Sequence, residues 1–144
     1  MSTRHHWGRT RVTTDDIHRE LGGATQLRGV TVPCLHYPAT RRFYIDRLGL
    51  RLMGQNRGYA VLESRGVRLV LVDTRKVPGF HREAGQGIYL ELRVANLARI
   101  QQRLAAGGEP TPPPRRTGSG LLLTVTDPEG NLVNLVELRA RSRL

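Results

Sequence analysis

The sequence predicts an α+β fold in which two βαβββ modules form a curved mixed sheet, with the helices on its convex face. Three observations lead to this prediction. The order strand, helix, strand, strand, strand occurs twice, at 29–73 and at 88–138. The best strands alternate aliphatic positions with mixed ones, as in a sheet that helices cover on one side. Turn residues with a clear conformational preference, such as Arg65-Gly66, separate paired strands.

Residues 1–28 form an N-terminal extension ahead of the repeat. Residues 1–12 are polar and basic, and an untethered end of this composition predicts disorder. The segment Thr13-Thr14-Asp15-Asp16 supplies a helix N-cap and the acidic residues of a first turn, and Gly22-Gly23 ends a helix. We therefore expect one short helix here, which can pack only through a narrow apolar stripe.

The first module begins with a strand in which Val30 and Val32 alternate with Thr31. Pro38 begins a helix and Gly49 ends it. The elements that follow in this module are a short strand at 50–53, a loop at 54–58, and strands at 59–64 and 67–73 that form a hairpin.

A linker at 74–87, rich in glycine and proline, leads to the second module. Its expected elements are a strand at 88–94, a helix at 97–106, a proline-rich edge segment at 109–114, and strands at 121–126 and 132–137. The last two strands are joined by the turn Asp127-Pro128-Glu129-Gly130, in which proline fixes φ and glycine accepts a positive φ. A basic tail, 139–144, follows.

Length and composition predict one soluble domain. With 144 residues, 38% of them hydrophobic, the chain can bury a single core. No run of 18 apolar residues is present, so we expect no membrane span, and the basic N-terminus lacks the apolar stretch of a secretory signal. Cys34 is the single cysteine, which excludes an internal disulfide and fits a reducing cytosol. We therefore expect a cytoplasmic protein.

The net charge of +11 raises the question of a nucleic-acid partner. Every cation except Lys76 is an arginine, and no block of five or more like charges occurs. Few aromatic side chains are present to stack on bases. We expect an arginine-rich soluble surface rather than a nucleic-acid site.

Alternation along the four best strands separates two faces. One face is purely aliphatic, and we expect helices to cover it: Val30, Val32, Leu69, Leu71, Leu90, Leu92, Val133 and Leu135. The opposite face mixes apolar, polar and charged side chains: Gly29, Thr31, Pro33, Arg68, Val70, Val72, Tyr89, Glu91, Arg93, Leu132, Asn134 and Val136. Such a mixture suits the wall of a ligand cavity, and it equally suits a sheet face that is turned to solvent.

These features resemble the vicinal oxygen chelate superfamily, which includes glyoxalase I, extradiol dioxygenases and bleomycin-resistance proteins. The resemblance covers residues 29–138. The segments that carry it are Phe43-Tyr44-x-Asp46-x-Leu48-Gly49 before a strand, the hairpin strands at 59–63 and 67–72, and Asp127-Pro128-Glu129-Gly130-Asn131 before the last strand. It implies the paired βαβββ fold, whereas function varies within the group between metalloenzymes and metal-free binding proteins.

Metal-dependent members of this superfamily bind their ion through side chains on the concave face, and the matching positions here are Gly29, Val70, Tyr89 and Asn134. Glycine and valine offer no donor atom, a tyrosine phenol is a poor ligand at neutral pH, and an amide oxygen is a weak one. We therefore expect neither a metal nor another cofactor.

The leading hypothesis is a metal-independent small-molecule-binding protein that resembles bleomycin-resistance proteins and sequesters its ligand, as antibiotic-resistance proteins do. The candidate ligand-binding residues are Tyr59 and Tyr89 for stacking, and Thr31, Arg68, Glu91, Arg93 and Asn134 for polar contacts. Arginines on this face favour an aromatic neutral or anionic natural product. The resemblance also implies a homodimer.

Two other functions remain open. The chain is an enzyme of the same superfamily, a lyase or isomerase of a biosynthetic pathway, if Glu91 acts as base and Tyr89 as acid without a metal. It is a scaffold or regulatory module if the N-terminal helix is a docking element.

Overall fold

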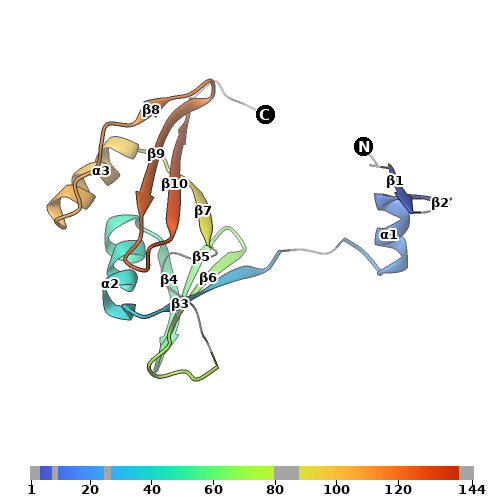
Figure 1. The fold of residues 1–144 in the computed structure, drawn as a ribbon, viewed down its shortest axis with the longest axis horizontal. Coiled ribbons are helices and arrows are strands. Elements are labelled where there is room, and N and C mark those ends of the chain that lie inside the picture. Colours follow the sequence, from blue (N-terminus) through green and yellow to red (C-terminus); the bar gives the residue numbers. More distant parts are fainter. Residues whose placement is uncertain (1–3, 8–9, 25–26, 80–87, 140–144) are drawn as a thin grey trace.

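The computed structural model describes residues 4–7, 10–24, 27–79 and 88–139. Two βαβββ modules follow an N-terminal extension, and each module forms its own four-stranded mixed sheet (Figure 1). The predicted α+β class with two such modules is confirmed. No helix in the described part of the chain is long and apolar enough to cross a membrane.

The first module contains a sheet in the order β3-β6-β5-β4, with β3 parallel to β6. Its elements are β3 (Gly29–Cys34), α2 (Tyr37–Arg42), a π-helix η1 (Phe43–Arg47), β4 (Arg51–Asn56), β5 (Tyr59–Ser64) and β6 (Val67–Asp73). The predicted hairpin is confirmed, and its turn residues Arg65 and Gly66 both take a positive φ.

The predicted loop at 54–58 is wrong over most of its length. Gly54, Gln55 and Asn56 belong to β4 and pair with β5, and only Arg57-Gly58 lies outside the strands. The register shifts between Leu52 and Gly54, so one extra residue is accommodated in a β-bulge. This bulge lets the strand continue through residues whose local preference is for a loop.

The second module repeats this architecture. Its sheet has the order β7-β10-β9-β8, with β7 parallel to β10. Its elements are β7 (Tyr89–Arg93), α3 (Leu97–Ala106), β8 (Arg115–Arg116), β9 (Gly120–Thr126) and β10 (Leu132–Leu138). The side chain of Asn96 caps α3 by accepting a hydrogen bond from the backbone N–H of Arg99, at 3.0 Å.

The core lies between the sheets and the helices. Most of the aliphatic face predicted from alternation packs with side chains of α2, η1 and α3 in a single cluster. Val30, Leu69, Leu90 and Leu92 are only partly buried, and Val30 is not a member of the cluster. Its fully buried members include Val32, Leu71, Val133 and Leu135 from the strands. Figure 1 shows α2 and α3 on one side of the sheets, which leaves the mixed face uncovered by helices.

A buried carboxylate joins the two modules. Glu129, in the turn before β10, accepts hydrogen bonds from the backbone N–H groups of Leu35 and His36, at 2.8 and 2.7 Å, and from the hydroxyl of Thr40, at 2.7 Å. Both Glu129 and Thr40 are buried. The turn predicted as a hairpin loop is therefore also a contact between modules.

Asp127, in the same turn, makes a second contact of this kind. Its carboxylate accepts a hydrogen bond of 2.5 Å from the hydroxyl of Tyr44. It also accepts hydrogen bonds from the backbone N–H groups of Glu129 and Asn131. Desolvation by burial, followed by the charge of Asp127, raises the pKa of Tyr44 well above its usual value. Tyr44 therefore acts as a permanent hydrogen-bond donor.

The single helix predicted between Pro38 and Gly49 is observed as two types of helix. The α-helix α2 gives way at Phe43 to η1, in which the N–H of Leu48 bonds to the carbonyl of Phe43, five residues earlier. The guanidinium of Arg103, from α3, donates to the carbonyl oxygen of Asp46 at 2.9 Å. A side chain of the second module thus satisfies a carbonyl in the irregular turn.

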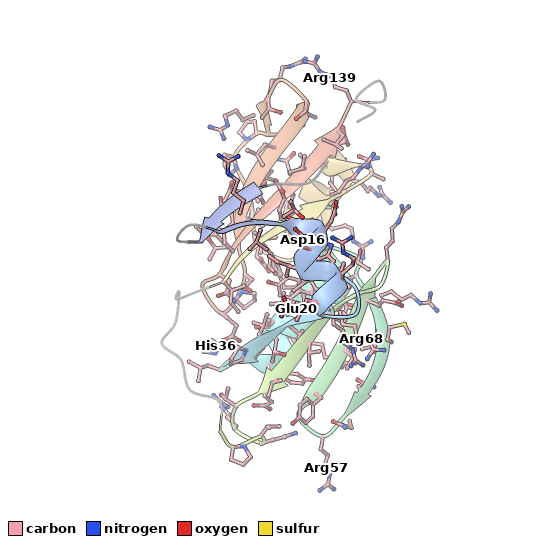
Figure 2. The ribbon with its side chains drawn as sticks, turned by 90° about the vertical axis from the view of Figure 1, so that its right-hand side faces the viewer. Asp16, Glu20, His36, Arg57, Arg68 and Arg139 are labelled. Carbon is pink, nitrogen blue, oxygen red and sulfur yellow. The ribbon has the colours of Figure 1, made fainter. Side chains whose placement is uncertain are left out.

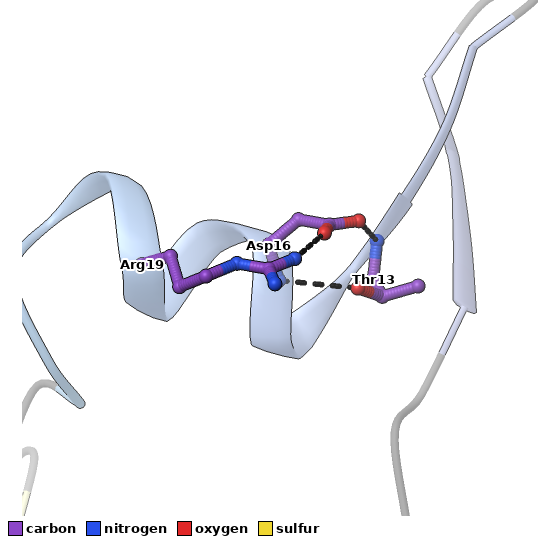
Figure 3. Close-up of polar contacts among 3 residues, drawn as sticks. All are labelled: Thr13, Asp16 and Arg19. Carbon is purple, nitrogen blue, oxygen red and sulfur yellow. Dashed lines mark hydrogen bonds and ion pairs between the residues drawn. The ribbon is translucent and has the colours of Figure 1, made fainter.

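At residues 4–7 and 10–12 the N-terminal extension forms strands where the sequence predicts disorder, and residues 1–3 and 8–9 lie outside the described residues. β1 (Arg4–Trp7) and β2 (Thr10–Thr13) form an antiparallel hairpin, and α1 (Thr14–Glu20) follows. The predicted N-cap is confirmed, because the Thr13 hydroxyl accepts the N–H of Asp16 while the Asp16 carboxylate accepts the N–H of Thr13, each at 3.1 Å (Figure 3). Strand pairing stabilises a stretch that composition alone identifies only as polar.

Candidate functional site

We use the name open face for the side of both sheets that α2 and α3 do not cover. In the first sheet Thr31 lies beside Val70, and Gly29 beside Arg68. In the second sheet Asn134 lies beside Glu91. Side chains at paired positions point to the same side of a sheet, so the predicted mixed face is assembled on these strands.

A hydrogen-bonded row crosses the open face of the second sheet. The amide nitrogen of Asn134 donates to the hydroxyl oxygen of Tyr89 at 2.9 Å, and the hydroxyl of Thr124 donates to the amide oxygen of Asn134 at 2.5 Å. The three residues come from the neighbouring strands β7, β10 and β9. The row holds the phenol of Tyr89 in place although its side chain is 62% exposed, so an aromatic surface stands ready for a ligand to stack upon.

An apolar groove of about 300 Å³ lies where the two modules meet. Three predicted site residues, Arg68, Tyr89 and Glu91, line it. The other lining residues are mainly aliphatic: Leu27, Val30, Leu50, Leu62, Glu63, Ser64, Val67, Leu69, Leu90 and Leu92. A pocket with apolar walls and a few polar groups is typical of small-molecule sites.

A larger and more polar cleft of about 810 Å³ adjoins this groove and shares Leu50, Ser64, Glu91 and Leu92 with it. Two arginines, Arg65 and Arg93, line the cleft. Its second glutamate, Glu137, accepts a hydrogen bond from the N–H of Leu97 at 2.8 Å and so caps the start of α3.

Glu91 lines both cavities and is exposed. Within the described ranges the one ion pair joins Arg19 to Asp16, so the Glu91 carboxylate is not neutralised by Arg68 or Arg93. It remains available to a ligand in either cavity.

The structure brings together four of the seven predicted ligand-binding residues. Arg68, Tyr89, Glu91 and Arg93 line the groove or the cleft, and Asn134 contacts Tyr89. Thr31 and Tyr59 lie on the first sheet and line neither cavity. Tyr59 pairs with Val72, which is fully buried, so that end of the predicted face is closed to a ligand.

The four positions that the resemblance matched to metal ligands carry a donor set that does not fit a divalent ion. A Cβ placed on Gly29 would lie 2.6 Å from the carbonyl oxygen of Arg68, so the backbone leaves no room there for a ligating side chain. Val70 has no donor, and Tyr89 and Asn134 bond to one another. Among the residues that the structure describes, no three His, Cys, Asp or Glu side chains are grouped to hold a metal.

Sequence reasoning missed the residues that come from outside the best strands. Leu27 precedes β3 and Leu50 precedes β4, and both line the groove. Thr124 carried a usable signal, because the hairpin turn after β9 places it directly opposite Asn134. Arg65 was recognised only as a turn residue, although it also lines the cleft.

Comparison with known proteins identifies one family. The model of the Glyoxalase/Bleomycin resistance protein/Dioxygenase superfamily matches residues 26–135. None of the curated proteins matches the chain. An antibiotic-binding protein from Streptomyces sp. CB03234, TnmS3, is 23% identical with a TM-score of 0.63, over 81% of this chain and 98% of that one.

Two further solved structures are similar. A lactoylglutathione lyase from Agrobacterium tumefaciens is 20% identical with a TM-score of 0.59, over 79% of this chain and 94% of that one. A glyoxalase/bleomycin resistance protein/dioxygenase from Nocardioides is 19% identical with a TM-score of 0.61, over 90% of this chain and 96% of that one. At these identities the likeness shows the fold alone.

Proposed function

The chain belongs to the Glyoxalase/Bleomycin resistance protein/Dioxygenase superfamily, and from this premise we propose that it is a small-molecule-binding protein that works without a metal. The observation that carries the proposal is the apolar groove at the module junction, with the exposed ring of Tyr89 in its wall. The likeness in fold to an antibiotic-binding protein supports it. The blocked position at Gly29 argues against the metal-dependent branch of the family.

The ligand that suits this site is a neutral or anionic aromatic natural product. Aliphatic walls and Tyr89 favour a flat apolar body. Arg65 and Arg93 in the adjoining cleft favour a carboxylate, phenolate or quinone oxygen on one edge of that body, because guanidinium groups bind such oxygens through paired hydrogen bonds. The protein would act by sequestering this compound, as an antibiotic-resistance protein does.

A homodimer is part of the proposal. The open face carries exposed large apolar side chains from both modules, among them Met53, Tyr89 and Leu132. Exposed apolar side chains that lie together, as Tyr89 and Leu132 do at paired positions, are typical of interaction sites. A partner subunit placed against this face would close the groove and cleft into a cavity.

Calorimetric titration with three probes that share one ring tests the ligand class: naphthoate, naphthol and naphthylmethylammonium. We expect the anion to bind most tightly, the neutral probe next and the cation most weakly. Arg93→Gln should weaken naphthoate about 5-fold and leave naphthol within about 2-fold. Arg99→Gln, the same change on the convex helix α3, is the matched control.

Tyr89→Leu tests the stacking surface, and we expect it to weaken all three probes by about 5- to 10-fold. Absence of saturable binding by any of them would contradict the binding function. Tightest binding of the cation would contradict the ligand class alone. Stoichiometric metal, found by elemental analysis after incubation with zinc, nickel, manganese and ferrous iron, would contradict the metal-free mechanism.

The second candidate is an enzyme, a lyase or isomerase that uses acid and base residues instead of a metal. The observation that favours it is Glu91, which lines both cavities, forms no ion pair with any residue that the structure describes, and stands on the same strand face as Tyr89. Turnover of a carbonyl or epoxide substrate that is lost in Glu91→Gln, while probe affinity is retained, would support this function. Equal turnover by the wild type and Glu91→Gln would exclude that role.

A further inference from the structure

The N-terminal segment forms an ordered unit without a core of its own. We call the described residues 4–7 and 10–23 the arm; they comprise β1, β2, α1 and the two glycines that follow. No residue of α1 is buried, and the side chain of Leu21 is 64% exposed. A helix of seven residues and a two-stranded hairpin are each marginal in water, so the arm needs a surface to pack against.

The arm does not pack on the modules of its own chain. Figure 1 shows it apart from both sheets, on the side away from α2 and α3. In Figure 2, which looks onto that side, α1 stands in front of the sheets with Asp16 and Glu20, and Arg68 lies to one side of it. The family match begins at residue 26, after the arm. The arm therefore projects from the open face.

Charge on α1 is opposite to that of the chain. The net charge of the whole sequence is +11, yet 3 of its 12 acidic residues, Asp15, Asp16 and Glu20, lie on this short helix. Asp16 is engaged in the capping box and with Arg19, whereas Asp15 and Glu20 are exposed. α1 thus offers a local acidic surface that a basic partner can meet.

The open face provides the complementary surface. Arg65, Arg68 and Arg93 line the groove and cleft at the junction of the modules and are all exposed; we call them the basic rim. Beside them Leu27, at 73% exposure, lines the apolar groove. A basic rim around exposed apolar side chains is what an acidic amphipathic segment would cover.

We propose that the arm of one copy docks on the open face of a second copy of this chain, and that the second arm docks in return on the first. Asp15 and Glu20 of α1 meet the basic rim, and Leu21 of the same arm lies against the exposed Leu27 at the edge of the apolar groove, which stays open to the ligand. Reciprocal exchange of identical segments gives a closed two-fold dimer, which leaves neither arm nor open face unpartnered. This interface goes beyond the proposed ligand binding and needs no ligand to form.

The test uses two variants of the full chain and measures the dimer dissociation constant by analytical ultracentrifugation. The first, Asp15→Lys with Glu20→Lys, reverses the net charge of α1 while leaving its capping box intact. The second, Arg68→Glu with Arg93→Glu, reverses the basic rim. We expect each variant alone to dissociate at least 10-fold more readily than the wild type, because like charges then face each other at both contacts.

Mixing the two variants in equal amounts distinguishes exchange between copies from docking within one chain. In the mixed dimer the basic α1 of one variant meets the acidic rim of the other, and the acidic α1 of the second meets the basic rim of the first, so both contacts are restored. We expect its dissociation constant to return to within about 3-fold of the wild-type value. Two control variants change the net charge by the same amounts away from the proposed contact. Asp46→Lys with Glu109→Lys, in η1 and after α3, matches the first variant, and Arg75→Glu with Arg99→Glu, after β6 and in α3, matches the second.

Three outcomes would overturn the proposal. One is a dissociation constant that does not change when residues 1–23 are deleted. Another is failure of the mixture to recover, which would mean that the arm docks on its own chain or on a different protein. The third is an equal loss of affinity in the control variants, which would assign the effect to net charge alone.

Discussion

Replacement of Glu129 by alanine is expected to destabilise the protein by about 4 kcal/mol. The buried carboxylate accepts two backbone N–H groups and the Thr40 hydroxyl, all within 2.8 Å. A hydrogen bond to a charged group contributes about 1.5–3 kcal/mol, and the cost of burying the charge offsets part of the sum. Removal of the carboxylate leaves three donors without an acceptor. Because these donors belong to the other module, the loss falls on the contact between modules.

Urea denaturation followed by circular dichroism measures this effect as a shift in the midpoint at constant slope. Glu129→Gln, which keeps one acceptor oxygen, should cost about 2 kcal/mol, and Thr40→Val about 1.5 kcal/mol. Glu109→Gln is the control, since the Glu109 side chain makes no hydrogen bond within the described ranges, and it should cost less than about 0.5 kcal/mol. A loss below about 1 kcal/mol in Glu129→Ala would refute the reasoning, because it would show that water replaces the carboxylate without penalty.

Three further predictions concern stability. Tyr44→Phe removes the hydrogen bond to Asp127 and should cost about 2 kcal/mol. Burial raises the pKa of Tyr44 above its usual 10, so above pH 10 only the unfolded chain releases the phenol proton. The free energy of unfolding of the wild type should therefore fall by about 1.4 kcal/mol per pH unit above pH 10, whereas that of Tyr44→Phe should lack this slope. Gly29→Ala should cost about 1–3 kcal/mol in urea denaturation, because the new Cβ collides with the carbonyl oxygen of Arg68. Hydrogen bonds from the threonine N-cap lower the pKa of Asp16 below 3.8, so the chemical shifts of α1 should stay helical above that pH and lose this character as pH falls further.

Local signals in the sequence were sufficient for most of the fold. Turn residues at Arg65-Gly66 and Asp127-Pro128 require particular φ values, which is why both hairpins could be predicted. The segment 54–58 could not, because its preference for a loop is overridden by pairing with β5 through a bulge. The hairpin of the arm was missed for the same reason: pairing between strands, rather than composition, decides it.

The candidate site was predictable only where it follows a single sheet. Alternation placed Tyr89 and Asn134 on one face, and the structure joins them by a hydrogen bond. The groove depends instead on how the two modules meet, and no periodicity in the sequence encodes that arrangement. Leu27 and Leu50 therefore line it without any preceding signal, while Thr31, on an equally well predicted strand, stays outside it.

Phe43 and Tyr44 are adjacent in sequence, and both side chains are buried in the core. The wide turn of η1 determines the direction in which each of them points. A π-turn holds one residue more than the α-turn it replaces. Deletion of Phe43 would restore α-helical spacing and place Tyr44 directly after Arg42, in the direction that Phe43 now takes. The segment would remain helical, yet the phenol of Tyr44 would no longer face Asp127 on the other module. A length change of one residue in this helix, which a surface loop would tolerate, is therefore expected to uncouple the two halves of the protein.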